Sequence, residues 1–280
     1  DPEPLGAIEE LCKLLGDWAK LCDALERRAK EASDEEAAEL LARLGRTRHE
    51  MLDDPLAAAA AYERAIELMP DDTSTIDRLT ALYSESEEPK HERLVELYQR
   101  RIELATSDEA DLRYETSMRA ASILEEKLGR PRDAIASLTS AVEARPGDGA
   151  ALRRLEALFR SEAMYDDLLD NLREQASLAE TDTLRADLRA AMGAIHADQL
   201  SAPGEALEHY REALELVPLH DGAIRALLQI AEAHPDHRLD AAQALLGVLR
   251  ASERHEDRVR VLELKATAES EGEGRAETLC

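Results

Sequence analysis

The chain has 280 residues, of which 61 are acidic and 35 are Lys or Arg, so its formal net charge is −26. The abundant Ala, Leu, Glu and Arg are strong helix formers, whereas β-branched and aromatic residues are scarce, which predicts an all-α protein and excludes a large β-sheet. The negative charge is spread along the chain, so contacts with nucleic acid phosphates or anionic membranes are not expected. No apolar run approaches the ~20 residues of a membrane-spanning helix, so direct membrane insertion is not expected either.

The first predicted element is a helix pair over 5–33, which contains Cys12 and Cys22. Together with Cys280 they make three cysteines, without the CxxC spacing of a redox or metal motif. This pattern fits buried thiols in a reducing compartment better than a disulfide framework. We therefore expect a cytoplasmic protein. A periplasmic location is the alternative if a signal peptide was removed, because the chain begins with Asp1 instead of Met.

A four-helix unit over 34–107 follows, and its first two helices define a pattern. The first of them, at 37–52, is amphipathic and has the small residue Gly45. The second helix has a proline at each end. The first proline favours the start of a helix, because the N–H that it lacks would have no partner there, and the second proline ends the helix. Between the prolines, two Ala residues two helical turns apart face the same neighbour, with an aromatic residue between them. These five positions are Pro55, Ala58, Tyr62, Ala65 and Pro70.

The same register returns in four-helix units over 108–180 and 181–252. The five positions recur at spacings of 76 and then 72 residues, as Pro131, Ala134, Leu138, Ala141 and Pro146, and as Pro203, Ala206, Tyr210, Ala213 and Pro218. The small residue of the preceding helix recurs at the same spacings, as Ala121 and Gly193. A further unit begins with a helix at 253–268, and the Gly- and Glu-rich segment 271–280 is predicted to be a flexible tail.

These hairpins resemble the tetratricopeptide repeat (TPR), in which small residues, an aromatic residue and a proline occupy matching positions of two helices. The intervening pairs resemble it less, because they keep an aromatic residue in the first helix, Tyr83 or Phe159, but lack the Ala and Pro signature. The resemblance implies a right-handed superhelical α-solenoid of about seven antiparallel helix pairs, forming a single domain over 1–270. Since the chain begins and ends within the repeat, we expect the array to continue in a longer parent protein.

Catalytic motifs are absent from the sequence: there is no glycine-rich nucleotide loop, nucleophile elbow or HExxH motif. The best metal candidate is the segment from His234 to His237, with His220 and Asp240 nearby. Pro235 interrupts the helix between the two histidines, so an exposed turn is the favoured interpretation. We predict that the chain is not an enzyme and has neither a cofactor nor a metal site.

In TPR proteins the first helices of the hairpins line a concave face that binds peptides or partner helices. The resemblance therefore implies a groove here, and the residues that it selects are mostly acidic with several Arg: Glu39, His49, Glu50, Asp77, Glu115, Met118, Glu125, Glu126, Arg153, Arg160, Asp187, Asp198 and Arg225. The same reasoning adds Ala42, Arg46 and Glu85. The Asn and Lys carboxylate clamp of the chaperone-binding members is not expected, because the chain has one Asn and few Lys. An ordinary solvated face is the alternative interpretation.

These features predict a non-catalytic scaffold for protein–protein interaction, which displays an acidic groove to a partner protein or peptide, in the first instance a basic one. One alternative is a spacer or oligomerisation arm without a groove ligand. Another is a recruiting or regulatory domain of a larger protein whose enzymatic part lies outside this chain. A metal or small-molecule sensor is the third. The excess of Ala and Arg over Lys is typical of a high-GC bacterial gene, and the sequence leaves the oligomeric state open.

Overall fold

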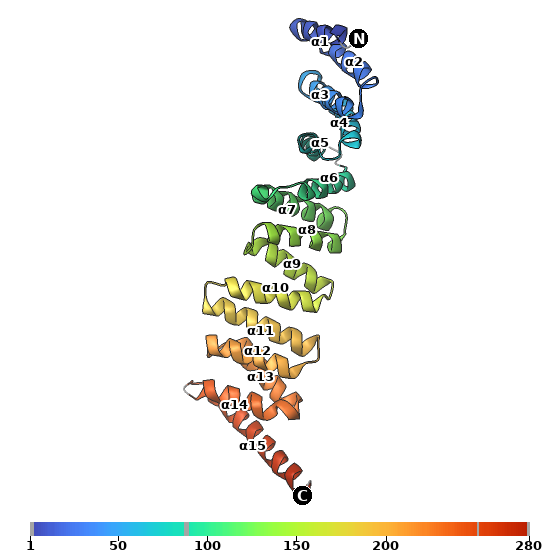
Figure 1. Ribbon diagram of the computed structural model, residues 1–280. Coiled ribbons are helices and arrows are strands. Elements are labelled where there is room, and N and C mark those ends of the chain that lie inside the picture. Colours follow the sequence, from blue (N-terminus) through green and yellow to red (C-terminus); the bar gives the residue numbers. More distant parts are fainter. Residues whose placement is uncertain (1–2, 87–89, 251, 279–280) are drawn as a thin grey trace. The chain divides into compact units, whose positions relative to one another are not determined.

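The computed structural model describes residues 3–86, 90–250 and 252–278. Over these residues it contains fifteen α-helices, two short 3₁₀ helices and no strand, which confirms the all-α prediction. Within α1 to α8 and within α9 to α15, consecutive helices pack side by side as a tandem series of helix pairs (Figure 1). The chain divides into two compact units, Asp1–Pro146 and Gly147–Cys280. The single continuous domain expected over 1–270 stays a prediction.

The first unit contains eight of the α-helices. They are α1 (Glu3–Leu15), α2 (Trp18–Ala29), α3 (Asp34–Leu52), α4 (Pro55–Leu68), α5 (Thr73–Glu85), α6 (His91–Glu103), α7 (Ala110–Glu126) and α8 (Pro131–Ala144), with a 3₁₀ helix at Ser107–Glu109. Cys12 and Cys22 are buried free thiols of α1 and α2, as the sequence predicts, while Cys280 lies outside the described residues.

The second unit contains the other seven. They are α9 (Gly149–Ser161), α10 (Tyr165–Leu178), α11 (Asp182–Asp198), α12 (Pro203–Leu216), α13 (Asp221–Ala233), α14 (Arg238–Leu249) and α15 (His255–Thr278), with a 3₁₀ helix at Pro235–His237. The sequence predicts a last helix that ends at 268 and a flexible segment over 271–280, whereas α15 continues to Thr278. Glu, Ala and Arg favour helix in this segment, and they outweigh the cost of about 1 kcal/mol for each of Gly272 and Gly274.

The repeated register defines three equivalent hairpins, α3–α4, α7–α8 and α11–α12, in which the two helices are in extensive contact. All the Ala and aromatic or Leu positions of the register are buried, with Ala58, Ala134 and Ala206 wholly inaccessible to solvent. The second helix of each hairpin starts at its predicted proline and ends two residues before the second proline of the register. The packing of these helices therefore follows the pattern found in the sequence.

The turn inside each hairpin adopts the same backbone conformation. Asp53, Gly129 and Ser201 stand at the spacings of 76 and 72 residues, and their φ angles of 51°, 61° and 52° are all left-handed. In each turn the residue that follows donates its N–H to a carbonyl six residues earlier, as in Asp54 to Arg48, which is the pattern of a left-handed helix C-cap. Glycine is the residue that this conformation favours, yet only one of the three copies has it.

Candidate functional site

The thirteen residues selected for the groove all lie on the first helices of the pairs, α3, α5, α7, α9, α11 and α13. Eleven are exposed, and only Met118 and Glu125 are half-buried. The first three of these helices belong to one unit and the last three to the other. The functional role of this face stays a prediction.

Several of the selected charges are engaged in ion pairs that join helices. Glu50 of α3 lies 3.3 Å from Arg78 of α5, and Asp187 of α11 lies 2.9 Å from the Nε2 atom of His220, which caps α13. Asp77 of α5 accepts a hydrogen bond of 3.1 Å from Nε of Arg101. Part of the acidic face therefore stabilises the stacking of helices within a unit.

Arg101 is at the centre of the tightest of these contacts. Its side chain is only 8% exposed, and its Nη2 atom donates to Glu109 at 2.6 Å while Nε donates to Asp77. The hydrogen bond from Arg101 holds the pKa of Glu109 well below its ordinary value, at about 2, with help from the N–H of Thr106. This residue thus joins α5, α6 and the start of α7.

A cleft of ≈ 610 Å³ lies beside this face in the first unit, and we call it the α4–α5 cleft. It is lined by His49 and Asp53 at the end of α3, by α4, by the end of α5 and by the residues that lead to α6. Its lining residues are His49, Asp53, Pro55, Leu56, Ala59, Ala60, Glu63, Leu82, Tyr83, Glu85, Ser86 and Lys90. Of the groove positions expected from the sequence, His49 and Glu85 are therefore part of it.

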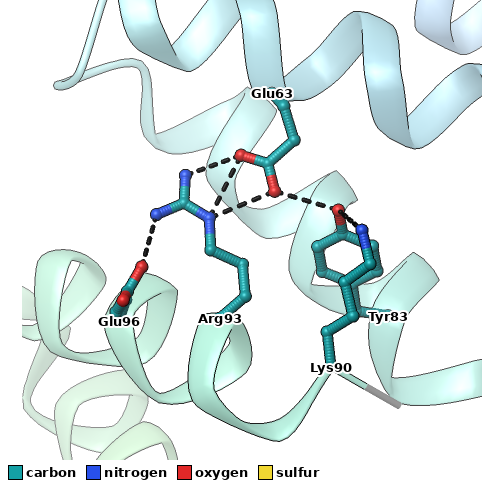
Figure 2. A network of polar contacts seen from close by, with 5 residues as sticks. All are labelled: Glu63, Tyr83, Lys90, Arg93 and Glu96. Carbon is teal, nitrogen blue, oxygen red and sulfur yellow. Dashed lines mark hydrogen bonds and ion pairs between the residues drawn. The ribbon is translucent and has the colours of Figure 1, made fainter. Parts of the chain in front are cut away.

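Three residues that form one wall of the α4–α5 cleft, Glu63, Tyr83 and Lys90, belong to the network of polar contacts shown in Figure 2. Arg93 of α6 donates hydrogen bonds from its Nε and Nη2 atoms to the carboxylate of Glu63 of α4, at distances of 3.1 and 2.6 Å. It also forms an ion pair with Glu96 at 2.7 Å. Tyr83 of α5 donates its hydroxyl to Glu63 at 2.9 Å. The Nζ atom of Lys90 lies 3.4 Å from that hydroxyl and 5.0 Å from the centre of its ring.

This network shifts the pKa values of two of its members, Tyr83 and Arg93. Burial, together with the hydrogen bond to Glu63, raises the pKa of Tyr83 to about 12, so its hydroxyl remains a donor at neutral pH. The contacts with Glu63 likewise raise the pKa of Arg93. The hydrogen bonds of Tyr83 and Arg93 to Glu63 thereby connect three helices, α4, α5 and α6, at one side of the cleft (Figure 2).

The lining of the α4–α5 cleft combines apolar surface with acidic groups. Leu56 is 83% exposed although it is a large apolar side chain on the first turn of α4. It lines the cleft with Pro55, Ala59 and Ala60, beside the carboxylates of Asp53 and Glu85. Three carboxylates and one ammonium group line the cleft, because Glu63 and Lys90 complete the set. Such a surface suits an apolar side chain flanked by basic groups.

A smaller cleft of ≈ 290 Å³ lies in the second unit, where the start of α9 meets the connection between α10 and α11. Arg153, another residue selected from the sequence, lines it together with the exposed Leu178 and Leu184. Within this unit a selected residue is again placed beside exposed apolar side chains.

The residues considered for metal binding lie in the connection between α13 and α14. His234 ends α13, and His237 is the last residue of the 3₁₀ helix that follows. Over the described residues, no three His, Cys, Asp or Glu side chains are grouped so that they could hold a metal ion. In the same part of the chain, no helix combines the length and the apolarity needed to cross a membrane.

The sequence analysis did not identify the apolar and polar residues that line the α4–α5 cleft beside His49 and Glu85. One feature of the sequence does point to Leu56, because it is a large apolar residue that does not lie on the buried face of the helix formed by Ala58, Tyr62 and Ala65. Tyr83 was noted only as the aromatic residue of a less regular pair. Nothing in the sequence indicated that it lies beside Lys90 and Glu63.

No protein-family model matches the chain, and no curated protein is similar to it in sequence. Several solved structures are similar to it in fold. YrrB, described as a TPR protein with an unusual peptide-binding site, is 20% identical over 73% of this chain and 98% of its own, with a TM-score of 0.36. MamA is 16% identical over 71% and 96%, with a TM-score of 0.35. Human IFIT1, solved as a dimer with PPP-AAAA, is 15% identical over 96% and 77%, with a TM-score of 0.39.

The TPR-like character of the chain is evident in its own packing. The small residue of each first helix is buried, and in two hairpins the ring of Tyr62 or Tyr210 lies directly against Gly45 or Gly193. These are the contacts that the repeated register predicts. The helical-repeat architecture is thus confirmed, while the ligand of the array is a separate question.

Proposed function

We propose that the chain is a non-catalytic scaffold that binds basic segments of partner proteins, and that the α4–α5 cleft receives an apolar side chain of the bound segment. The observation that carries this proposal is Leu56, which is 83% exposed in a cleft that three carboxylates line. Leu56 does not stand alone, because Pro55, Ala59 and Ala60 line the same cleft, and an apolar patch with charged groups at its rim marks a site of interaction.

The architecture supports such a role. In a helical-repeat protein each pair contacts mainly its neighbours, and the stacked helices present extended surfaces that are used for binding. The net charge of −26 attracts basic partners and raises their rate of encounter. Arg93 and Tyr83 fix Glu63 in place, so the wall of the cleft is ordered before a partner arrives. A preformed site lowers the entropic cost of binding.

The exposed acidic residues of the first helices extend the same surface. Glu39, His49 and Glu50 lie on α3, and His49 also lines the α4–α5 cleft. A segment anchored at Leu56 would pass these side chains with its basic groups. We therefore place the recognition of charge on α3 and the anchoring of an apolar side chain at Leu56.

A peptide library selected on the immobilised chain tests the proposal. The selected peptides should combine Lys or Arg with one large apolar residue, and added salt should weaken their binding. Leu56→Asp should weaken binding of a selected peptide about tenfold or more, because the burial of one large apolar side chain contributes about 1.5–3 kcal/mol. Leu219→Asp, which changes another exposed leucine outside the cleft, should leave the affinity unchanged.

A second pair of variants tests the face of the first helices. Glu39→Arg on α3 should weaken the same peptide, whereas Glu67→Arg on α4 makes the same change of charge on a second helix and should have a smaller effect. Peptides without basic residues, or equal binding to the wild type and to Leu56→Asp, would contradict the proposal. Failure to select any peptide would favour the spacer interpretation.

A further inference from the structure

The smaller cleft of the second unit, of ≈ 290 Å³, combines apolar surface with one cation, and we call it the α9–α11 cleft. It lies between the start of α9, the end of α10 and the start of α11. Its apolar lining includes four leucines, Leu152, Leu178, Leu184 and Leu188. Leu178 is 47% exposed and Leu184 is 48% exposed, so part of this apolar surface is open to solvent. The cation is Arg153 of α9.

Arg153 has no polar partner in the part of the chain that the structure describes. Its side chain is exposed and makes neither an ion pair nor a hydrogen bond there. Its Nη1 atom lies beside the first residue of α9, because a Cβ added to Gly149 would stand 2.9 Å from it. The one carboxylate of the lining, that of Glu180, is exposed and does not pair with Arg153. A guanidinium group thus lies beside apolar surface without an acceptor.

The first unit shows what the same place holds in another copy of the repeat. Three pairs of residues stand at the same distance from the starts of equivalent helices: Asp77 and Arg153, Arg101 and Gln175, and Glu109 and Thr181. In the first unit the side chain of Arg101 is only 8% exposed, and it donates to Asp77 at 3.1 Å and to Glu109 at 2.6 Å. A guanidinium group held by two carboxylates therefore fills this place.

In the second unit, uncharged side chains replace two members of this ion cluster. Gln175 is shorter than Arg101, and its amide group donates to two other side chains of the unit. Thr181 accepts an N–H of the first turn of α11 and so caps this helix. Both residues line the cleft, but neither forms a hydrogen bond with Arg153. The cleft therefore lies where the first unit buries Arg101, and the charge at the position of Asp77 is reversed.

The third copy supplies a carboxylate where the second has none. Asp221 is the first residue of α13, as Gly149 is the first residue of α9. It forms an ion pair with Arg254, which directly precedes α15. In the first and third copies the chain itself thus provides both an Arg and its carboxylate. Within the described residues, the second copy has the cation, Arg153, and lacks the carboxylate that would pair with it.

We propose that the α9–α11 cleft binds a glutamate side chain that lies between apolar residues in a segment of a partner protein. The carboxylate would pair with Arg153, and the apolar neighbours would pack on Leu178 and Leu184. A guanidinium group can bind a carboxylate through two parallel hydrogen bonds, which adds specificity to affinity. Glutamate is expected in preference to aspartate, because the first unit places the long side chain of Arg101 here. The α4–α5 cleft suits basic segments, so the two clefts recognise different classes of segment.

Nuclear magnetic resonance (NMR) of the full chain tests the proposal, with the tripeptide acetyl-Leu-Glu-Leu-amide as the probe. The Nε–H signal of Arg153, assigned with Arg153→Lys, and the methyl signals of Leu178 and Leu184 should shift until they saturate. Acetyl-Leu-Gln-Leu-amide has a similar shape without the charge. It should bind about tenfold more weakly or less, because hydrogen bonds between two charged groups are the stronger ones. Added salt should weaken binding of the glutamate peptide.

Three variants separate recognition from folding, with the leucine methyl signals as the readout. Arg153→Glu should bind the glutamate peptide about tenfold more weakly or less, and should bind acetyl-Leu-Lys-Leu-amide more tightly than the wild type does. Arg173→Glu makes the same change of charge at an exposed Arg of α10 outside the cleft, and should leave the affinity unchanged. The triple variant Arg153→Asp/Gln175→Arg/Thr181→Glu installs the residues of the first unit, so it should remain folded and no longer bind the glutamate peptide.

Several results would overturn the proposal. They are the absence of a saturable shift up to about 10 mM peptide, equal binding of the glutamine peptide, wild-type affinity of Arg153→Glu, and equal losses of affinity in Arg153→Glu and Arg173→Glu. Self-association of the wild type that Arg153→Glu abolishes would also overturn it, because the occupant is then a second copy of the chain. Leu56→Asp should leave binding of the glutamate peptide intact, so failure of this proposal is distinct from failure of the α4–α5 cleft.

Discussion

The ring of Tyr62 lies so close to Gly45 that a Cβ on the glycine would stand 2.7 Å from Cε1 of the tyrosine. Gly193 and Tyr210 repeat this relationship in the third hairpin, at 2.9 Å. In the second hairpin the same two positions hold Ala121 and Leu138, a larger residue facing a smaller one. The two helices of each hairpin thus approach closely because the volumes at this contact are complementary.

We expect Gly45→Ala to destabilise the protein, although Ala favours helix over Gly by about 1 kcal/mol. Overpacking at a buried contact costs about 1–3 kcal/mol, and the ring that the added methyl group would meet, that of Tyr62, is fully buried. Adding Tyr62→Leu should restore part of the stability, because it recreates the pair found in the second hairpin. Urea denaturation of the single and double variants measures this, and equal stability of Gly45→Ala and the wild type would contradict it.

The left-handed turns predict opposite effects at two equivalent positions. Ser201→Gly should stabilise the protein by about 0.5–1 kcal/mol, because glycine adopts the φ of 52° without steric cost. Gly129→Ala should destabilise it by about 1 kcal/mol, and since no atom lies within 4 Å of the added Cβ, the effect comes from the backbone alone. Denaturation midpoints at an unchanged m-value would check both changes. Shifts of the same sign would show that the turn conformation is not the cause.

Arg101 predicts a measurable change in the titration of Glu109. Replacing it by Met removes the hydrogen bond that holds the pKa of Glu109 at about 2, so this pKa should return toward its ordinary value of 4.5. The variant should also unfold at lower temperature, because Asp77 and Glu109 lose the cation that joins their helices. Carbon-detected NMR titration of the glutamate carboxyls checks the first effect. An unchanged pKa of Glu109 would mean that the N–H of Thr106 is sufficient.

His209 of α12 predicts that the second unit loses stability in mild acid. Its ring stacks on that of His196 with 5.1 Å between centroids. Burial lowers the pKa of His209 below its ordinary 6.5, with His196 adding to this effect and Glu212 opposing it. The folded state therefore binds a proton less readily than the unfolded state, so this contribution to stability is complete above about pH 6.5 and decreases as the pH falls toward the lowered pKa.

Melting temperatures between about pH 7.5 and 5.5 measure this dependence, since carboxylates contribute mainly at lower pH. His209→Gln should reduce the loss of stability over that range. His234→Gln changes an exposed histidine at the end of α13 and serves as the control, with the pH dependence of the wild type. A pH dependence that is the same in all three proteins would place its origin elsewhere.

The sequence predicts the helices well because the residues that determine where helices start and where they pack closely recur at the same spacing. Pro55, Pro131 and Pro203 mark helix starts, and the small residues at Gly45, Ala121 and Gly193 mark where helices approach. These signals are local, and each acts through the backbone or through a neighbour only one helix away. The end of α15 was placed too early, because Gly272 and Gly274 suggested a flexible segment where the surrounding residues favour helix.

The candidate site is less predictable because it depends on residues that come together only in space. The cleft beside Leu56 is lined by residues of α3, α4, α5 and the segment that leads to α6, and the periodicity of the sequence does not tell how these elements come together. Asp77 forms an ion pair with Arg101, which lies 24 positions later, and no local pattern in the sequence predicts this contact.

The shared left-handed turn has a consequence for how such a chain can change length. Because Asp53, Gly129 and Ser201 give their hairpins the same exit geometry, genetic recombination between copies would join α3 to α8, or α7 to α12, without a new kind of turn. Whole copies could then be gained or lost by unequal crossover. The difference between spacings of 76 and 72 residues arises in the pairs between the hairpins, so the variation in length falls where the register is least strict.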